Sequence, residues 1–296
     1  MTMNTGQFNN LYTRKIDMAF FEGWDEEPEQ WSRIFNSKTG DSHNNTTQIL
    51  AGMSRWTSKA ELANADQQRF KQGPLIVTNY EPFAVEVIMS REQIDDAKYN
   101  EVQDMAKDAG HGGREAVEQE CASFLQDLYD STFYDGKAAF ANDHPNHGDG
   151  GGTQDNLTTG ALSDTTLKDA IILFRKQEDE GGKKISSRPS KLVVPQSLQF
   201  TAASILQSAL QTGTANNDKN VLPNLELVVS DFWDQYTTVR WFICGNRHQL
   251  NHIWRVQPEF KKRQYMNPNG SQSWDGYFRH ANEITNWRHL VGSTGV

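Results

Sequence analysis

Residues 188–208 (RPSKLVVPQSLQFTAASILQS), 224–232 (NLELVVSDF) and 240–245 (RWFICG) decide the fold class of this chain. Short apolar runs that are rich in Val, Leu and Ile are typical of buried strands. Between the apolar runs at 191–194 and 225–230, apolar residues recur every three or four positions, and this spacing predicts a helix. We therefore expect strands at 191–194, 225–230 and 239–244, the first of them ending at Pro195.

A second helical pattern precedes these strands. It begins at Ser163 or Asp164, which are both favourable N-cap residues, and we expect it to end at the glycine pair 181–182. Its apolar face consists of Leu167, Ala170, Ile171 and Phe174. The resulting order, helix–strand–helix–strand–strand, is typical of a compact α+β unit.

The longest element expected in the chain is a helix that follows Ser90. Ser90 and Gln93 have the spacing of a capping box, and the helical pattern continues to about Asp130. Three glycines, Gly110, Gly112 and Gly113, interrupt the pattern and predict a bend or break that could act as a hinge. One face of the helix carries an apolar stripe made of Val117, Cys121, Phe124, Leu125 and Leu128.

Before this helix the sequence predicts a long β-hairpin with a large polar tip. Residues 46–53 (TTQILAGM) form one strand-like run, and residues 74–89 (PLIVTNYEPFAVEVIM) form another with alternating apolar positions. The tip, residues 54–73, has few apolar side chains and cannot build a core of its own. Its basic residues are Arg55, Lys59, Arg69 and Lys71.

The two ends of the chain differ in character. Residues 1–45 mix aromatic residues with turn formers, and we expect an arm with a few anchors instead of a domain. The tail from residue 251 is rich in aromatic residues and short strand-like runs. No apolar run approaches the roughly 18 residues that a membrane span needs, so we expect a cytoplasmic protein without a membrane partner.

Composition excludes some functions. The chain has 29 Lys and Arg residues against 38 Asp and Glu residues, a net charge of −9, which disfavours a dedicated DNA-binding protein. It also carries fewer apolar residues than an ordinary globular domain of 296 residues, which favours an extended subunit completed by its neighbours. The two cysteines, Cys121 and Cys244, lie in apolar patterns and are expected to be free, buried thiols.

No motif for catalysis or for a cofactor stands out. Asp143, His144, His147 and Asp149 could face one metal ion, but the glycine-rich surroundings favour an exposed loop. The GDGGG run at 148–152 lacks the Lys and Ser/Thr of a phosphate-binding loop. We expect no catalytic residue, no cofactor and no metal site.

The order of these features resembles the Mu-like head-subunit family of phage major capsid proteins, which share the Hong Kong 97 type fold. The resemblance is clearest over residues 133–245, and the expected hairpin and long helix occur upstream in the same order as in that fold. Its individual motifs include Asp135 with Gly136, His144 with Pro145, and the strand at 191–194 that ends at Pro195.

The resemblance implies an α+β capsid fold with four regions. These are an N-terminal arm (1–45), an extended loop (46–80), a peripheral domain with the spine helix (81–132 and 246–296) and an axial domain (133–245). The implied partners are further copies of the chain in pentamers and hexamers, together with scaffolding, portal and decoration proteins. The implied location is the virion, with assembly in the host cytoplasm around double-stranded DNA that is not specifically bound.

The expected built-in scaffold of that fold, a long charged coiled-coil segment, does not occur in this sequence. Either a separate scaffolding protein exists or such a segment has been removed. Two other interpretations stay open at this point: a cellular nanocompartment shell of the same fold, and a metal-dependent enzyme that uses His144 and His147.

Overall fold

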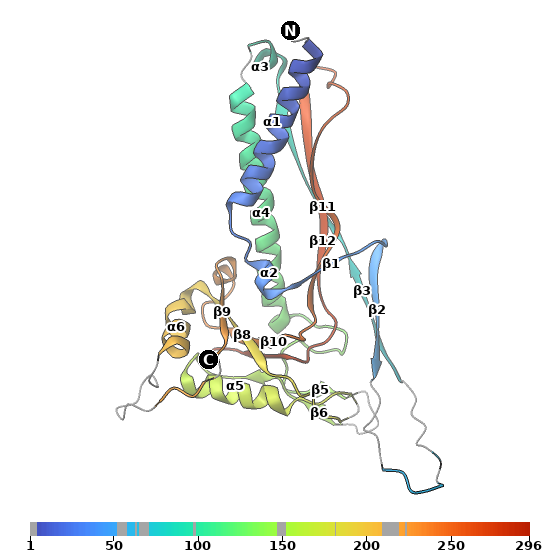
Figure 1. Cartoon of the computed structure of the whole chain (residues 1–296), viewed down its shortest axis with the longest axis vertical. Coiled ribbons are helices and arrows are strands. Elements are labelled where there is room, and N and C mark those ends of the chain that lie inside the picture. Colours follow the sequence, from blue (N-terminus) through green and yellow to red (C-terminus); the bar gives the residue numbers. More distant parts are fainter. Residues whose placement is uncertain are drawn as a thin grey trace.

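The structure is a computed structural model that describes residues 5–51, 58–62, 64, 71–96, 99–146, 152–180, 182–208, 219–222 and 224–296. It has a tall upper region, a broad base and a two-stranded hairpin that leaves the body at the waist (Figure 1). Two long helices lie beside a four-stranded sheet in the upper region. In the base a five-stranded sheet is packed with shorter helices. None of the described helices combines the length and apolar character that crossing a membrane requires.

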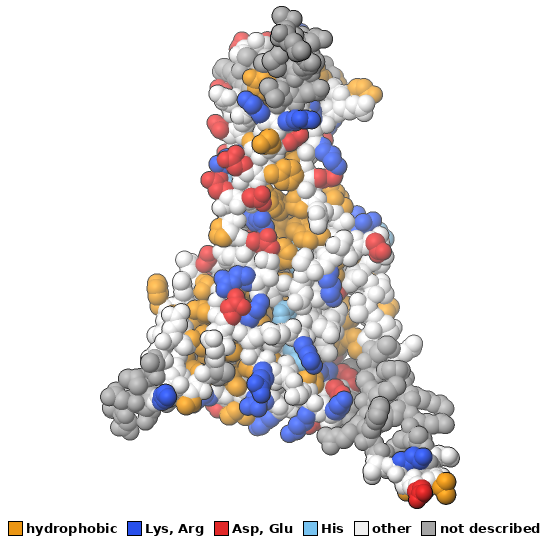
Figure 2. Space-filling view, in the orientation of Figure 1, with side chains coloured by type: hydrophobic (Ala, Val, Ile, Leu, Met, Phe, Trp, Pro, Cys, Tyr) orange, Lys and Arg blue, Asp and Glu red, His pale blue; other side chains and the backbone are white. Residues whose placement is uncertain are grey.

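The upper sheet has the strand order β1-β11-β12-β4. The long strands β11 (Leu250–Lys262) and β12 (Gln272–Ile284) form an antiparallel hairpin, β4 (Glu81–Met89) pairs with β12, and β1 (Asn36–Thr39) runs parallel to β11. Aromatic residues fill the space between this sheet and the helices. The ring of Phe20 stacks on Phe260 at 4.4 Å, and Phe83 stacks on Phe278 at 5.0 Å. Figure 2 shows hydrophobic side chains along this seam.

The spine helix α4 (Tyr99–Asp130) is continuous, so the predicted break at Gly110, Gly112 and Gly113 is wrong, while the hinge expected at these glycines stays a prediction. Two of these glycines instead allow helix α1 (Thr5–Glu26) to approach closely. A Cβ atom at Gly110 would lie 2.1 Å from the carbonyl oxygen of Phe20, and one at Gly113 would lie 2.7 Å from the Trp24 ring. The packing gained offsets the cost of glycine within a helix, about 1 kcal/mol per residue.

The start of the spine also differs from the prediction. The capping box of Ser90 and Gln93 is confirmed, but it opens a separate short helix, α3 (Arg91–Asp95). The apolar stripe of α4 is confirmed: Val117, Cys121, Leu125 and Leu128 are at most 2% exposed, and Phe124 packs against the same core.

Much of the N-terminal region is helical. Helix α1 packs along α4 and buries Ile16, Phe20 and Trp24, because an amphipathic helix is stable only where its apolar face is covered. Its sequence signal was weak, since polar and turn-forming residues interrupt the aromatic ones. The sequence analysis did not predict this helix, and the assignment of residues 1–45 as an N-terminal arm stays a prediction.

A buried carboxylate holds the chain after α1. Glu118 of α4 accepts hydrogen bonds from the backbone N–H groups of Gln30 (2.8 Å) and Trp31 (3.1 Å), where the short helix α2 (Trp31–Ile34) begins. Burial raises the pKa of Glu118 to about 7, although these hydrogen bonds act in the opposite direction. Arg114 adds a hydrogen bond from its Nε to the carbonyl of Trp24 at 3.1 Å.

The base confirms the predicted α+β unit. Its sheet has the order β7-β13-β10-β8-β9. Helices α5 (Asp164–Lys176) and α6 (Gln199–Gln207) cover one face, and the lower end of α4 covers the other. Ser163 caps α5 as predicted, but α5 ends at Lys176, before the glycine pair. The strands are β7 (Leu157–Thr158), β8 (Pro189–Pro195), β9 (Glu226–Ser230), β10 (Trp241–Gly245) and β13 (Leu290–Ser293).

The C-terminal strand changes one predicted boundary. β13 pairs with β10 and β7, so the last residues of the chain belong to the base sheet and not to the upper region. The C-terminal segment 246–296, which the prediction placed in the peripheral domain, therefore contributes to both sheets. Strands β11 and β12 lie in the upper sheet, and β13 lies in the base sheet. Short 3₁₀ turns, η1 (Gln196–Leu198) and η2 (Phe232–Gln235), complete the base.

Two alanine substitutions on α4 test the role of its glycines. Gly110→Ala should destabilise the fold by about 1–3 kcal/mol, because the new methyl group meets the backbone of α1. Gly112→Ala should instead stabilise it by up to about 1 kcal/mol, because a Cβ atom there has nothing within 4 Å. Urea unfolding of both variants measures the difference. Equal effects from the two substitutions would contradict the packing role of Gly110.

Candidate assembly interface

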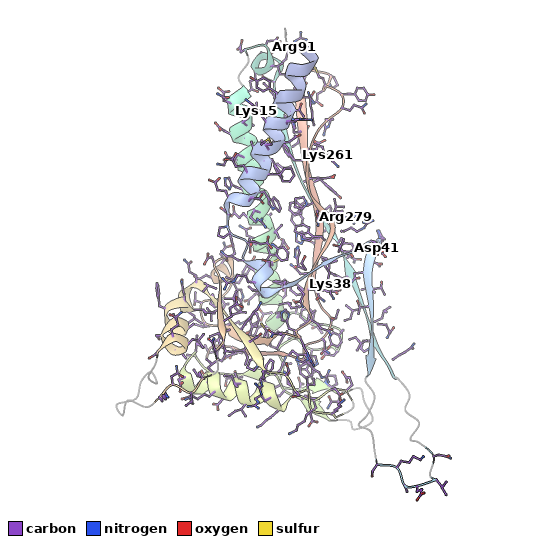
Figure 3. The ribbon with its side chains drawn as sticks, in the orientation of Figure 1. Lys15, Lys38, Asp41, Arg91, Lys261 and Arg279 are labelled. Carbon is purple, nitrogen blue, oxygen red and sulfur yellow. The ribbon has the colours of Figure 1, made fainter. Side chains whose placement is uncertain are left out.

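The hairpin of β2 (Asn44–Ala51) and β3 (Lys71–Asn79) leaves the body where β1 ends and β4 begins. Only Tyr80 separates β3 from β4, so the predicted single strand over 74–89 is two strands in two different sheets. Figure 3 shows Lys38 and Asp41 near this point, together with Arg279 of β12. We call this junction the hairpin root.

Tyr80 forms the apolar side of the hairpin root. It is 6% exposed and packs with Ile253 and Ala281 in a small core of their own. Burial, and then the charge of Glu283, raise the pKa of its hydroxyl. Gly40 lies directly against it, because a Cβ atom at Gly40 would be 2.0 Å from the Tyr80 oxygen. A side chain at position 40 would therefore displace the root.

Glu283 forms the polar side of the hairpin root. Its carboxylate is 3% exposed and accepts hydrogen bonds from Asn45 Nδ2 (2.7 Å) and Thr78 Oγ1 (3.0 Å), one from each strand of the hairpin. Asn251 Nδ2 donates a third hydrogen bond at 3.3 Å. One buried acid on β12 thus holds both strands of the hairpin to the body. The sequence analysis did not identify Glu283, because a single Glu in a strand-like run does not reveal which residues it will contact.

Beyond the root the hairpin has no second layer among the described residues of the subunit. Leu75 and Val77 on β3 are 55% and 51% exposed, although two strands with apolar side chains are stable only when a face is covered. Of the predicted tip residues, Lys59 is exposed, and Lys71 begins β3. Arg55 and Arg69 lie outside the described residues.

The motif residues of the base form a buried polar cluster. His144 is fully buried, its Nδ1 lies 2.6 Å from Asp135 Oδ2, and its Nε2 lies 3.1 Å from Asn156 Oδ1. Its ring stacks on Trp287 at 4.1 Å. The expectation of an exposed loop is therefore wrong for His144. The glycines and polar residues around His144 gave no indication that its side chain points into the core.

This cluster joins the loop after α4 to the segment that links β12 to β13. Arg288 pairs with Glu180 at 2.7 Å, and both side chains are buried. The guanidinium of Arg288 also lies over the Trp287 ring at 4.5 Å. The cluster therefore fixes the upper region on the base and has a structural role.

The other motif residues lie in turns and at the ends of strands. Gly136 has a φ of +78°, a conformation that residues with a side chain rarely adopt. Pro145 pairs with Thr153 between the short strands β5 (His144–Pro145) and β6 (Thr153–Gln154), and Pro195 ends β8. His147 and Asp149 lie outside the described residues. Among the described residues no three acidic, His or Cys side chains are placed to hold a metal ion.

Two further histidines lie in the upper core. His252 and His280 stack at 4.8 Å beside Trp254. Burial lowers the pKa of His252 to about 4 and that of His280 to about 3, so both are neutral at neutral pH. Cys121 lies 3.5 Å from His252 Nδ1. Both cysteines are free and buried as predicted, and burial raises the pKa of each thiol.

Glu283→Ala should loosen the hairpin root. Removing the carboxylate leaves three donors without their partner and should cost about 1–3 kcal/mol. We expect faster hydrogen exchange at the backbone amides of β2 and β3. Thr46→Val, an exposed position on β2, is the matched control and should leave exchange unchanged. Unaltered protection of β2 and β3 in the Glu283 variant would show that Glu283 does not hold the hairpin.

His144→Ala should destabilise the fold by about 2–4 kcal/mol, because it leaves Oδ2 of the buried Asp135 side chain without its partner and opens a cavity beside Trp287. Thermal unfolding monitored by circular dichroism measures the change. His43→Ala is the control, since His43 is exposed and its substitution should have little effect. Identical melting temperatures for the two variants would contradict the structural role of His144.

Three solved structures illustrate the fold of this chain. A structure from Microbacterium phage Oxtober96 aligns with a TM-score of 0.51 at 13% identity over 90% of this chain and 92% of that one. The virus-like particle from Pyrococcus furiosus aligns with a TM-score of 0.52 at 10% identity over 95% and 99%. The encapsulin complex from Synechococcus elongatus aligns with a TM-score of 0.51 at 10% identity over 91% and 88%.

The comparison with curated proteins gives no match. The family profile described as phage capsid protein, in contrast, matches residues 81–291, which include α4, the base and both long strands of the upper sheet. At identities this low the solved structures define the fold alone, and the profile defines the family. The chain therefore belongs to the phage capsid protein family, has the Hong Kong 97 type capsid fold and is a building block of a phage head.

Proposed function

We propose that this major capsid subunit joins its neighbours through the β2–β3 hairpin. The observation that carries the proposal is a two-stranded hairpin rooted firmly at Glu283 but uncovered beyond it, with Leu75 and Val77 exposed. Such a face gains stability when an adjoining copy covers it, at about 25 cal/mol per Å² of apolar area. The hairpin thus acts as an extended loop that lies on the next subunit.

Charge supports the same arrangement. The tip carries Arg55, Lys59, Arg69 and Lys71, whereas the whole chain has a net charge of −9. A basic tip is complementary to the acidic surface of another copy, and such complementarity selects the register of an interface. We infer a mechanism without catalysis, in which identical copies form pentamers and hexamers through repeated contacts.

The order of motifs from Asp135 to Pro195 favours the Mu-like head-subunit group within the capsid family. We propose scaffolding, portal and decoration proteins as partners, double-stranded DNA as a packaged and not specifically bound cargo, and assembly in the host cytoplasm. The net negative charge suits a wall along which DNA must move without adhering.

A cellular nanocompartment shell is the second candidate, because an encapsulin complex is among the structures with this fold. The phage capsid profile over residues 81–291 favours a phage head. Shells purified from the natural source distinguish the two, since a phage head contains double-stranded DNA and a nanocompartment contains protein.

Two variants test the hairpin interface. Replacing residues 54–70 by a short Gly-Ser turn, and separately substituting Leu75→Asp with Val77→Asp, should leave the subunit folded but abolish closed shells. Both changes act outside the described core, so circular dichroism should be unchanged. Gln72→Asp, an exposed position on the same strand, is the control and should assemble. Electron microscopy measures the outcome. Closed shells of normal stability from both hairpin variants would overturn the proposal.

A further inference from the structure

An apolar pocket lies in the upper region, between the spine helix α4 and the edge strand β4. Its volume is about 240 Å³, which exceeds the roughly 150 Å³ of an apolar cavity that holds a benzene molecule. On the sheet side it is lined by Phe83 and Val85 of β4 and by Phe278 of β12. Among the described strands β4 pairs only with β12, so no strand of the subunit covers this edge. We call this site the α4–β4 pocket.

Small residues of α4 form the helix side of the α4–β4 pocket: Ala109, Gly112, Gly113 and Ala116. Gly113 is explained by the packing of α1, because a Cβ atom there would lie 2.7 Å from the Trp24 ring. A Cβ atom at Gly112 has nothing within 4 Å. Glycine in the interior of a helix is destabilising, and no contact within the subunit offsets that cost at Gly112. The space beside Gly112 is therefore available to a group from outside the subunit.

The hairpin carries a pair of side chains whose chemistry and spacing fit this space. Leu75 and Val77 lie two residues apart on β3, so they point to the same side and are about 7 Å apart. Along α4 the pocket extends from Ala109 to Ala116, a length of about 10 Å. Figure 1 shows the hairpin running from the waist toward the level of the base, away from the middle of α4. The apolar pair that fits the pocket therefore comes from another copy.

Charge gives this fit a direction. Glu120 and Asp127 lie on the next turns of α4, and together with Glu81 they line a neighbouring pocket between the same helix and sheet. Burial, and then the charges of Glu81 and Asp127, raise the pKa of Glu120. The hairpin is basic on the tip side of its apolar pair, where Arg69 and Lys71 occur. An apolar strand followed by a basic tip is thus complementary to an apolar pocket followed by an acidic one, and such complementarity selects one register.

We propose that the α4–β4 pocket receives Leu75 and Val77 from the hairpin of an adjoining copy of this chain, with the basic tip toward Glu120 and Asp127. This inference rests on the proposed function and identifies the surface on which the hairpin lies. Contact with the pocket covers the exposed apolar pair of one copy and fills the space beside Gly112 of the next. Gly112 is then the residue that keeps the site open.

A disulfide between copies tests the contact directly. Shells of the double variant Gly112→Cys with Val77→Cys are oxidised, and the chains are separated on a non-reducing gel. A disulfide requires Cα atoms about 4.4–6.8 Å apart, and the native Cys121 and Cys244 are buried and do not compete. We expect most chains to be linked to a neighbour. Thr47→Cys with Gly112→Cys is the matched control, because Thr47 pairs with the residue before Val77 and points to the opposite face of the hairpin.

Gly112→Leu fills the pocket from its own subunit. The variant should remain folded, with a melting temperature no lower than that of the parent, because a side chain at this position meets open space. The yield of closed shells in electron micrographs should fall at least about tenfold. Gly112→Ala leaves most of the pocket open and should assemble. Asp108→Leu, at an exposed position of the same helix outside the pocket, is the second control and should also assemble.

Linked chains in the Val77 variant, together with the loss of shells from Gly112→Leu, support the site. A normal yield of shells from Gly112→Leu, or no more linked chains for Val77→Cys than for Thr47→Cys, would overturn it. If the hairpin variants described above lose their shells in that case, the hairpin still joins neighbouring copies but lies on a different surface. Failure of this inference is thereby distinguished from failure of the proposed function.

Discussion

Burial of the apolar stripe on α4 connects the two sheets of this subunit. The stripe packs against the aromatic face of β11 and β12 above, and its lower end covers one face of the base sheet. Tyr129, near the end of the same helix, donates a hydrogen bond to the carbonyl of Trp241 in β10 at 2.8 Å. Because one continuous helix spans both regions, their relative position depends on its packing.

Buried polar groups make this apolar packing specific. Glu118 holds the start of α2, Glu283 holds both strands of the hairpin, and His144 with Asp135 holds the loop below α4. Each lies where one region of the chain passes to another. Hydrophobic contacts tolerate small displacements, whereas a buried acceptor without its donor costs about 1–3 kcal/mol. These groups therefore select one arrangement among several that the apolar core would accept.

The hairpin shows how a stable subunit can remain incomplete. Its root is fixed by Glu283 and Tyr80, while Leu75 and Val77 beyond the root stay exposed. In the proposed assembly, an adjoining copy of the chain covers these side chains.

The sequence by itself determined the local elements of this protein. The α+β base, the Ser163 cap, the buried stripe of α4 and the free thiols follow from periodicity and capping, which depend on neighbouring residues. Only the tertiary structure decided the continuity of α4 through Gly110, the packing of α1, the burial of His144 and the role of Glu283. These depend on partners that are distant in the sequence, such as Phe20 for Gly110 and Asn45 for Glu283, and a distant partner leaves no trace in local pattern. A glycine within a helical pattern predicts a break from the sequence alone. Only the structure shows that Gly110 lacks a side chain where α1 packs closely against α4.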